Sequence, residues 1–111
     1  MLSLTSATRV FVALDPVDMR QGFNGLSARV QSVLQQEPTN GHLYVFTNRL
    51  RNRLKILFFD GTGLWVCAKR LEKGRWSWPH GAGASTVLRG EQLVALVSGL
   101  EVSEKAGWYR R

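Results

Sequence analysis

The stretch from Arg49 to Pro79, RLRNRLKILFFDGTGLWVCAKRLEKGRWSWP, decides the fold because it contains two apolar runs joined by turn residues. The runs Arg53–Asp60 and Leu64–Leu71 have the length and the apolar content of strands. Between them, the DGTG sequence of residues 60–63 tolerates positive φ angles and is expected to reverse the chain. We therefore predict that the two runs form an antiparallel hairpin.

Further strands are expected on both sides of this hairpin. Upstream, His42–Asn48 alternates in the manner of a strand, and residues 49–52 connect it to the next strand through an arginine-rich tip. Downstream, the EKGR turn of residues 72–75 is expected to lead into a short fourth strand, the WSW sequence of residues 76–78. The HGAGAS sequence of residues 80–85 is predicted to be a flexible loop.

Two helices are predicted, one before and one after these strands. Arg9–Leu14 reads as a first strand, and Asp18 followed three residues later by Gln21 resembles a capping box, which predicts a helix start at Asp18. Apolar residues then recur at helical spacing on one face: Met19, Phe23, Leu26, Val30 and Val33 or Leu34. A second amphipathic helix is expected over about Gly90–Gly99.

Together these elements predict an α+β fold with a single antiparallel β-meander sheet of four to five strands. One helix precedes the meander and one follows it, and both are expected to pack on one face of the sheet. The expected boundaries are an N-terminal extension over residues 1–8, a single α+β domain over 9–100 and a polar, flexible tail over 101–111. A chain of 111 residues is long enough for one hydrophobic core.

The composition excludes several classes of protein. Hydrophobic residues make up 44% of the chain and charged residues 21%, which is the ordinary range of folded domains. No apolar run approaches the roughly 20 residues that span a bilayer, and the first residues lack the pattern of an export signal. The single cysteine, Cys67, cannot form an internal disulfide and is expected to be a buried thiol in a cytoplasmic protein.

Positive charge is concentrated in one part of the chain. The sequence pI of about 10.5 and the net charge of +7 suit a polyanionic partner. Residues 49–75 carry +6 of this charge, and their basic side chains are the predicted nucleic-acid-binding residues: Arg49, Arg51, Arg53, Lys55, Lys69, Arg70, Lys73 and Arg75. The first four share parity, so in an extended chain they would project from one face and meet successive phosphates.

Aromatic residues are interleaved with this charge. Trp76 and Trp78 lie beside the basic turn and are candidates for stacking on bases or for contact with a partner, although core packing is the favoured interpretation. For the phenylalanines, packing in the core or on the sheet is the favoured interpretation.

No residue pattern requires a catalytic site, a metal site or a cofactor. The carboxylates of Asp15, Asp18, Glu37, Asp60, Glu72 and Glu91 include no close pair that only catalysis explains. His42 and His80 lack the spacing of a metal site, and the GTG of residues 61–63 lacks the rest of a phosphate-binding loop. We therefore expect no catalytic residue, no metal and no cofactor, and keep a nuclease or transposase-like site as the minor alternative.

Two stretches resemble a known family. RVFVALDPVDMRQGFNGL at residues 9–26, and residues 41–79 with their RLKIL, DG, KRLEKGR and WP motifs, are similar to the TnpB-type accessory proteins of the IS66 insertion-sequence family. With the helix near Glu91, the resemblance covers roughly residues 9–100. It implies a small bacterial protein encoded in a mobile element beside a separate, larger transposase and needed for efficient transposition. The RNA-guided nucleases that share the TnpB label are a different class of protein.

These observations predict a non-catalytic accessory protein for transposition that binds DNA at the ends of its element through a basic β-hairpin patch. The alternative is a protein-interaction module that binds the transposase or the second accessory protein without touching DNA, with Trp76, Trp78 and the last helix as anchors. A homo-oligomer formed through a sheet edge also suits the pattern. We expect a cytoplasmic location, on the nucleoid when DNA is bound, and no membrane association.

Overall fold

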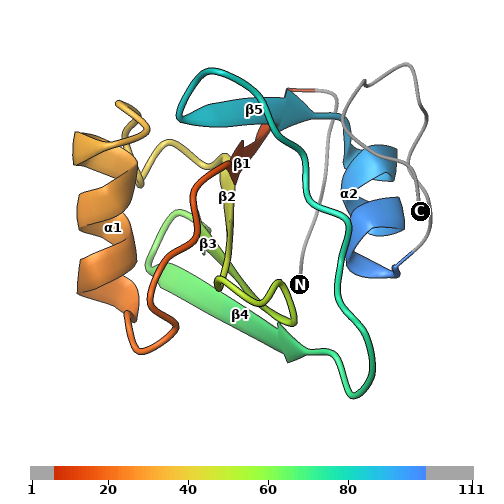
Figure 1. Ribbon diagram of the computed structural model, residues 1–111. Coiled ribbons are helices and arrows are strands. Elements are labelled where there is room, and N and C mark those ends of the chain that lie inside the picture. Colours follow the sequence, from red (N-terminus) through yellow and green to blue (C-terminus); the bar gives the residue numbers. More distant parts are fainter. Residues whose placement is uncertain (1–6, 100–111) are drawn as a thin grey trace.

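The computed structural model describes residues 7–99 and shows a five-stranded sheet with two helices (Figure 1). Most of the predicted N-terminal extension and the whole predicted tail over 101–111 lie outside the described residues. In chain order the elements are β1 (Val10–Ala13), α1 (Phe23–Ser32), β2 (Leu43–Thr47), β3 (Arg53–Phe59), β4 (Leu64–Arg70), β5 (Ser85–Leu88) and α2 (Gly90–Val97). The predicted antiparallel hairpin is confirmed as β3 and β4.

The sheet is mixed, not purely antiparallel as predicted, and its strand order is β4-β3-β2-β1-β5. β1 and β2 run parallel, with Phe11 opposite Tyr44, and α1 forms the crossover between them. A parallel pair needs such a crossover, whereas the other three strand pairs are antiparallel. Every residue of β1 and β2 is buried, and their continuous apolar sequence is typical of strands covered on both faces.

The two helices cover opposite faces of the sheet, which corrects the prediction that both pack on one face (Figure 1). Leu26 of α1 packs in one hydrophobic cluster with Tyr44, and Leu93 of α2 packs in the other with Val45. Because neighbours along a strand point to opposite faces, Tyr44 and Val45 contribute to two separate clusters. The domain therefore has three layers, with the sheet between α1 and α2.

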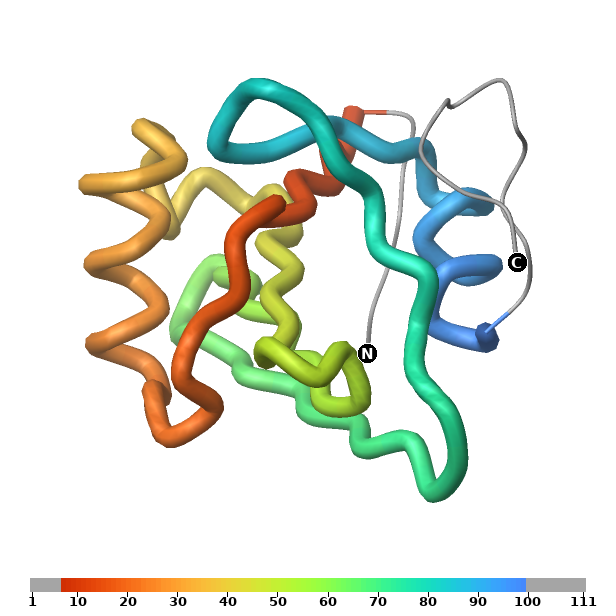
Figure 2. Tube along the Cα trace, in the orientation of Figure 1, coloured from red at the N-terminus to blue at the C-terminus, as the bar shows by residue number. Residues whose placement is uncertain are grey.

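Residues 71–84 connect β4 at one edge of the sheet to β5 at the other edge, and they cross the face that α2 covers (Figure 2). Trp76 and Trp78 lie on this segment, with only 2% and 4% of their surface exposed. Their indole N–H groups donate to Val97 O at 3.1 Å and to Ala13 O at 2.8 Å. The predicted fourth strand is wrong, and the burial of both tryptophans agrees with core packing, the favoured interpretation.

The fifth strand is β5, which runs antiparallel to β1 with Val87 opposite Phe11. The prediction of a loop over residues 80–85 therefore extends one residue too far, because Ser85 begins this strand. Its sequence, STVL, is short and becomes a strand through pairing with the buried β1.

α1 begins at Phe23 and not at Asp18 as predicted. The Asp18 carboxylate instead accepts a hydrogen bond from the Arg20 backbone N–H at 2.8 Å and pairs with the Arg20 guanidinium at 2.6 Å. Two backbone carbonyls of the segment before α1 also accept hydrogen bonds from Lys55 on β3, which anchor this segment to the sheet. Phe23, which was expected on the buried helix face, is 52% exposed.

The turn between β3 and β4 is organised by the Asp60 carboxylate, which confirms the predicted turn over residues 60–63. Its Oδ1 accepts hydrogen bonds from the backbone N–H groups of Thr62 and Gly63, at 2.9 and 3.0 Å. Its Oδ2 accepts a hydrogen bond from Trp65 Nε1 at 2.7 Å. These donors, the Trp65 indole foremost, favour the ionised form and hold the pKa of Asp60 well below its usual range.

We expect this turn to weaken in acid. Because the Asp60 pKa is lower in the folded state, its contribution to stability is present above the unfolded pKa of about 3.9 and is lost as pH falls toward the folded pKa. Asp60→Asn cannot ionise, so it should be less stable than the wild type near pH 7 and lose less stability on acidification. Urea unfolding at a series of pH values measures both effects, and an identical pH dependence in the two proteins would contradict the prediction.

Candidate nucleic-acid interface

Three connecting segments, residues 14–22, 48–52 and 71–84, meet at one end of the sheet, where β1, β2 and β4 end and β3 and β5 begin. Backbone hydrogen bonds hold them together. The N–H of Trp76 donates to Arg51 O at 2.8 Å, and the first segment is bonded to the last residue of β2 at the same distance. This end of the sheet is therefore a connected surface built from parts of the chain that are distant in sequence.

The β2–β3 turn has a defined shape because Asn48 organises it. Asn48 Oδ1 accepts hydrogen bonds from the backbone N–H groups of Asn52 and Arg53, at 3.0 and 3.1 Å, and its Nδ2 donates to Asn52 Oδ1 at 2.8 Å. Arg51 has a φ of 58°, a left-handed conformation that residues with a side chain rarely adopt. Leu50 is 65% exposed at the tip. Asn48 was not among the predicted site residues, although an Asn after an apolar run is a turn signal.

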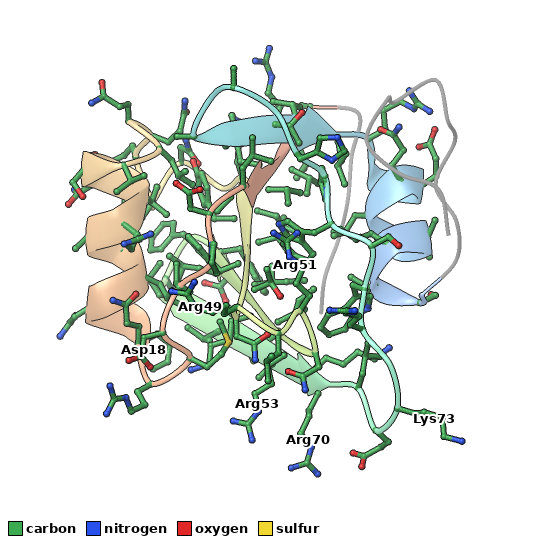
Figure 3. All side chains as sticks on the ribbon, in the orientation of Figure 1. Asp18, Arg49, Arg51, Arg53, Arg70 and Lys73 are labelled. Carbon is green, nitrogen blue, oxygen red and sulfur yellow. The ribbon has the colours of Figure 1, made fainter. Side chains whose placement is uncertain are left out.

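Six of the eight predicted basic residues lie at this end of the sheet or in the segments that meet there, and Figure 3 labels Arg49, Arg51, Arg53, Arg70 and Lys73 among them. We call them the basic sheet end: Arg49, Arg51, Arg53, Arg70, Lys73 and Arg75. Five of the six are exposed and Arg51 is half-buried. Within the described residues, the one ion pair in this set joins Arg70 to Glu72 at 3.3 Å, and both side chains are largely exposed. Exposed pairs of this kind contribute little to stability. With Glu72 counted, this set of side chains carries a net charge of +5.

The two remaining lysines lie on opposite faces of the sheet and bind backbone carbonyls. Lys55 Nζ donates to Met19 O and Gln21 O, both at 2.8 Å, on the α1 side. Lys69 Nζ donates to Val97 O at 3.0 Å on the α2 side. The alternation expected for an extended chain holds for Arg53 and Lys55 on β3, whereas Arg49 and Arg51 lie in the predicted connection between β2 and β3.

Replacing Lys55 with Met is expected to lower the free energy of unfolding by about 1–3 kcal/mol, because Met19 O and Gln21 O lose their donor while the side-chain volume is kept. Residues 14–22 should also exchange their amide hydrogens faster. Lys69→Met is the control, since it removes the same charge and a single hydrogen bond from an exposed position. Urea unfolding with hydrogen exchange measures the difference, and equal losses in the two variants would contradict the role of Lys55.

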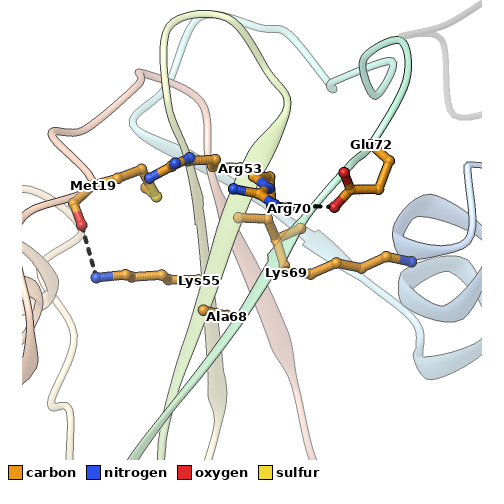
Figure 4. A pocket seen from close by; sticks show the side chains of 8 residues that line it. Met19, Arg53, Lys55, Ala68, Lys69, Arg70 and Glu72 are labelled. Carbon is orange, nitrogen blue, oxygen red and sulfur yellow. Dashed lines mark hydrogen bonds and ion pairs between the residues drawn. The ribbon is translucent and has the colours of Figure 1, made fainter.

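An open pocket of about 510 Å³ lies beside the basic sheet end (Figure 4). Its lining residues are Met19, Arg53, Leu54, Lys55, Ala68, Lys69, Arg70 and Glu72. In the antiparallel register of β3 and β4, Arg53 is opposite Arg70, and Lys55 is opposite Ala68. Residues directly opposite each other project from the same face of a sheet. Two arginines and one lysine therefore line the pocket from the α1 side.

Two of the carboxylates, those of Asp18 and Glu91, are paired with arginines that lower their pKa. The Arg20 guanidinium beside Asp18 lowers the pKa of that carboxyl to about 2, and Arg89 lowers the pKa of Glu91. A lowered pKa makes a carboxylate a weaker base near neutral pH. Across residues 7–99, no three His, Cys, Asp or Glu side chains are placed to hold a metal ion, and Cys67 is half-buried against the core. No helix in this range is long and apolar enough to cross a membrane.

Comparison with known proteins identifies relatives. The family model described as "IS66 Orf2 like protein" matches residues 8–107. Two proteins of Sinorhizobium fredii are similar over 101 residues, uncharacterized protein y4hO at 40% identity and uncharacterized protein y4jC at 35% identity. These matches cover 91% of this chain and 88% and 86% of the two relatives. No solved structure matches the chain.

Proposed function

Because the chain belongs to the IS66 Orf2-like family of insertion-sequence accessory proteins, we propose that it is a non-catalytic factor that binds DNA at the ends of its element. The basic sheet end is the surface that contacts the DNA. The contact holds the element end for the transposase or helps the transposase assemble on it.

One observation carries this proposal, the gathering of six basic side chains on a single connected surface. These residues come from the β2–β3 turn, from facing ends of β3 and β4 and from the segment after β4. Phosphates spaced along a nucleic acid backbone attract such a surface, and arginine forks bind phosphate oxygens in pairs. The hydrogen bonds around Asn48 hold the turn in place before the ligand arrives.

The salt dependence of DNA binding tests the proposal. If all six side chains neutralise phosphates, log K should fall with log salt at a slope of about −5.4, from roughly 0.9 per contact. The affinity should then drop about a thousandfold between 50 and 200 mM salt. A labelled element-end duplex, a scrambled duplex and a single strand would show which form is preferred. A slope near zero, or no binding at low salt, would overturn DNA contact as the function.

The second candidate is a protein-interaction module that binds the transposase or the second accessory protein. It is favoured by Val94 on the outer side of α2, which is 59% exposed. The tryptophans no longer support it, because both are buried in the core. Co-purification of the element proteins after nuclease treatment separates the two candidates. A stable equimolar complex that is insensitive to added DNA would favour the second.

A further inference from the structure

We propose that the pocket beside the basic sheet end is a discrete binding site for one phosphate group, held by Arg53 and Arg70. This inference rests on the proposed DNA binding for the source of the phosphate. In this site two arginines at fixed positions bind one phosphate, whereas the other basic side chains attract the DNA backbone without a fixed partner. That contact would set the position of the protein along the DNA backbone.

Two like charges are directly paired at this site. Arg53 and Arg70 face each other across β3 and β4, on the same face of the sheet. Like charges directly opposite in a sheet are destabilising. Within the described residues, Arg53 makes no ion pair, and Arg70 has only the exposed contact with Glu72 at 3.3 Å. The protein itself supplies little to offset this repulsion, whereas an anion between the two guanidinium groups would remove it.

The pocket around these arginines is open (Figure 4). Ala68, opposite Lys55, has a small side chain and leaves the space open. Met19 and Glu72 also line the pocket. The volume of about 510 Å³ is ample for a phosphate and the sugar atoms next to it.

Lys55 adds a third basic side chain to the same pocket. Its ammonium group has three donors, and two of them are used by Met19 O and Gln21 O at 2.8 Å. Neutral carbonyls do not cancel its charge, so Lys55 adds positive potential to the pocket and keeps one N–H free. Two guanidinium forks and one ammonium can together satisfy the several acceptor oxygens of one phosphate.

The direct test compares inorganic phosphate with chloride at equal ionic strength in thermal unfolding. Phosphate should raise the unfolding midpoint of the wild type and of Lys73→Gln and Arg75→Gln, each of which removes one charge outside the pocket. It should leave the midpoints of Arg53→Gln and Arg70→Gln unchanged. Without phosphate at low salt, Arg53→Gln should unfold at or above the wild-type temperature because the repulsion is gone. Equal responses in all five proteins would overturn the site.

The second test places neutral methylphosphonates, one position at a time, along an element-end duplex. A methylphosphonate at one position should lower the affinity of the wild type at least tenfold, and at the other positions much less. In the Arg53→Gln/Arg70→Gln variant, no position should show this large loss. Duplexes with and without a 5′-phosphate distinguish an internal phosphate from a strand end. Salt-steep binding with small, uniform losses would overturn the discrete site and leave the proposed function standing. If no DNA binds at all, the proposed function fails, and the inorganic phosphate test alone decides whether the pocket binds phosphate.

Discussion

Replacing Trp78 with Ala is expected to lower the free energy of unfolding by about 3–5 kcal/mol. This is a large part of the roughly 5–15 kcal/mol that stabilises a domain. The Trp78 ring is 4% exposed and packs between the sheet and α2. Its indole N–H donates to Ala13 O at 2.8 Å, which ties the segment after β4 to the interior strand β1. The substitution therefore removes apolar contacts, leaves a cavity and breaks a buried hydrogen bond. Urea unfolding followed by circular dichroism measures the loss.

Two further variants make this result specific. Trp78→Phe keeps most of the apolar volume without the hydrogen bond, so its loss should be intermediate. Trp65→Ala removes a tryptophan that is 41% exposed, so it should cost less than Trp78→Ala. If Trp78→Ala were as stable as the wild type and yet lost DNA binding, the base-stacking interpretation of Trp78 would be restored.

Replacing Arg49, Arg51, Lys73 and Arg75 together with Gln is expected to remove most of the affinity for duplex DNA. All four lie in the basic sheet end outside the phosphate pocket. The loss of four phosphate contacts should make the slope of log K against log salt shallower by about 3.6. At 0.1 M salt this corresponds to a loss of roughly a thousandfold or more in affinity. Gln keeps the backbone hydrogen bond that Arg51 O accepts from Trp76 N, so the fold should persist. Titration of a labelled duplex at several salt concentrations gives both quantities.

The matched control for this charge effect is Arg9→Gln. Arg9 is exposed and precedes β1, so it lies at the opposite end of the sheet from Arg49, which follows β2. Both single variants change the net charge by one. Arg49→Gln should lower affinity and the salt slope, while Arg9→Gln should change neither by much. If both variants lost affinity equally, net charge and not the basic sheet end would explain the binding.

The local elements of the fold were predictable from the sequence because their signals are local. The DGTG turn between two apolar runs predicted β3 and β4 to within one residue at their ends. The spacing of Leu93 and Leu96 predicted α2. The start of α1 was not predictable in the same way, since the segment from Asp18 to Gln21 is not helical and is bonded to Lys55, a residue far away in the sequence.

The sequence predicted the basic residues of the candidate site, but not which of them share one surface. Eight basic residues between 49 and 75 stand out in the sequence, and six of them meet at one end of the sheet. Parity placed Lys55 in a row with Arg49, yet the turn organised by Asn48 breaks that row. Tryptophans serve both in stacking sites and in hydrophobic cores, so the sequence alone left the role of Trp76 and Trp78 open.

The sequence by itself determined the β3–β4 hairpin, the excess of positive charge around it and the resemblance to the IS66 accessory proteins. Only the tertiary structure decided that β1 pairs in parallel with β2, that α1 and α2 cover opposite faces and that Arg53 faces Arg70. The physical reason is that side-chain periodicity assigns a residue to a strand or helix face, but it does not specify the neighbouring strand. Neighbours are chosen by contacts between residues far apart in the chain, and in this protein those contacts build both the core and the basic sheet end.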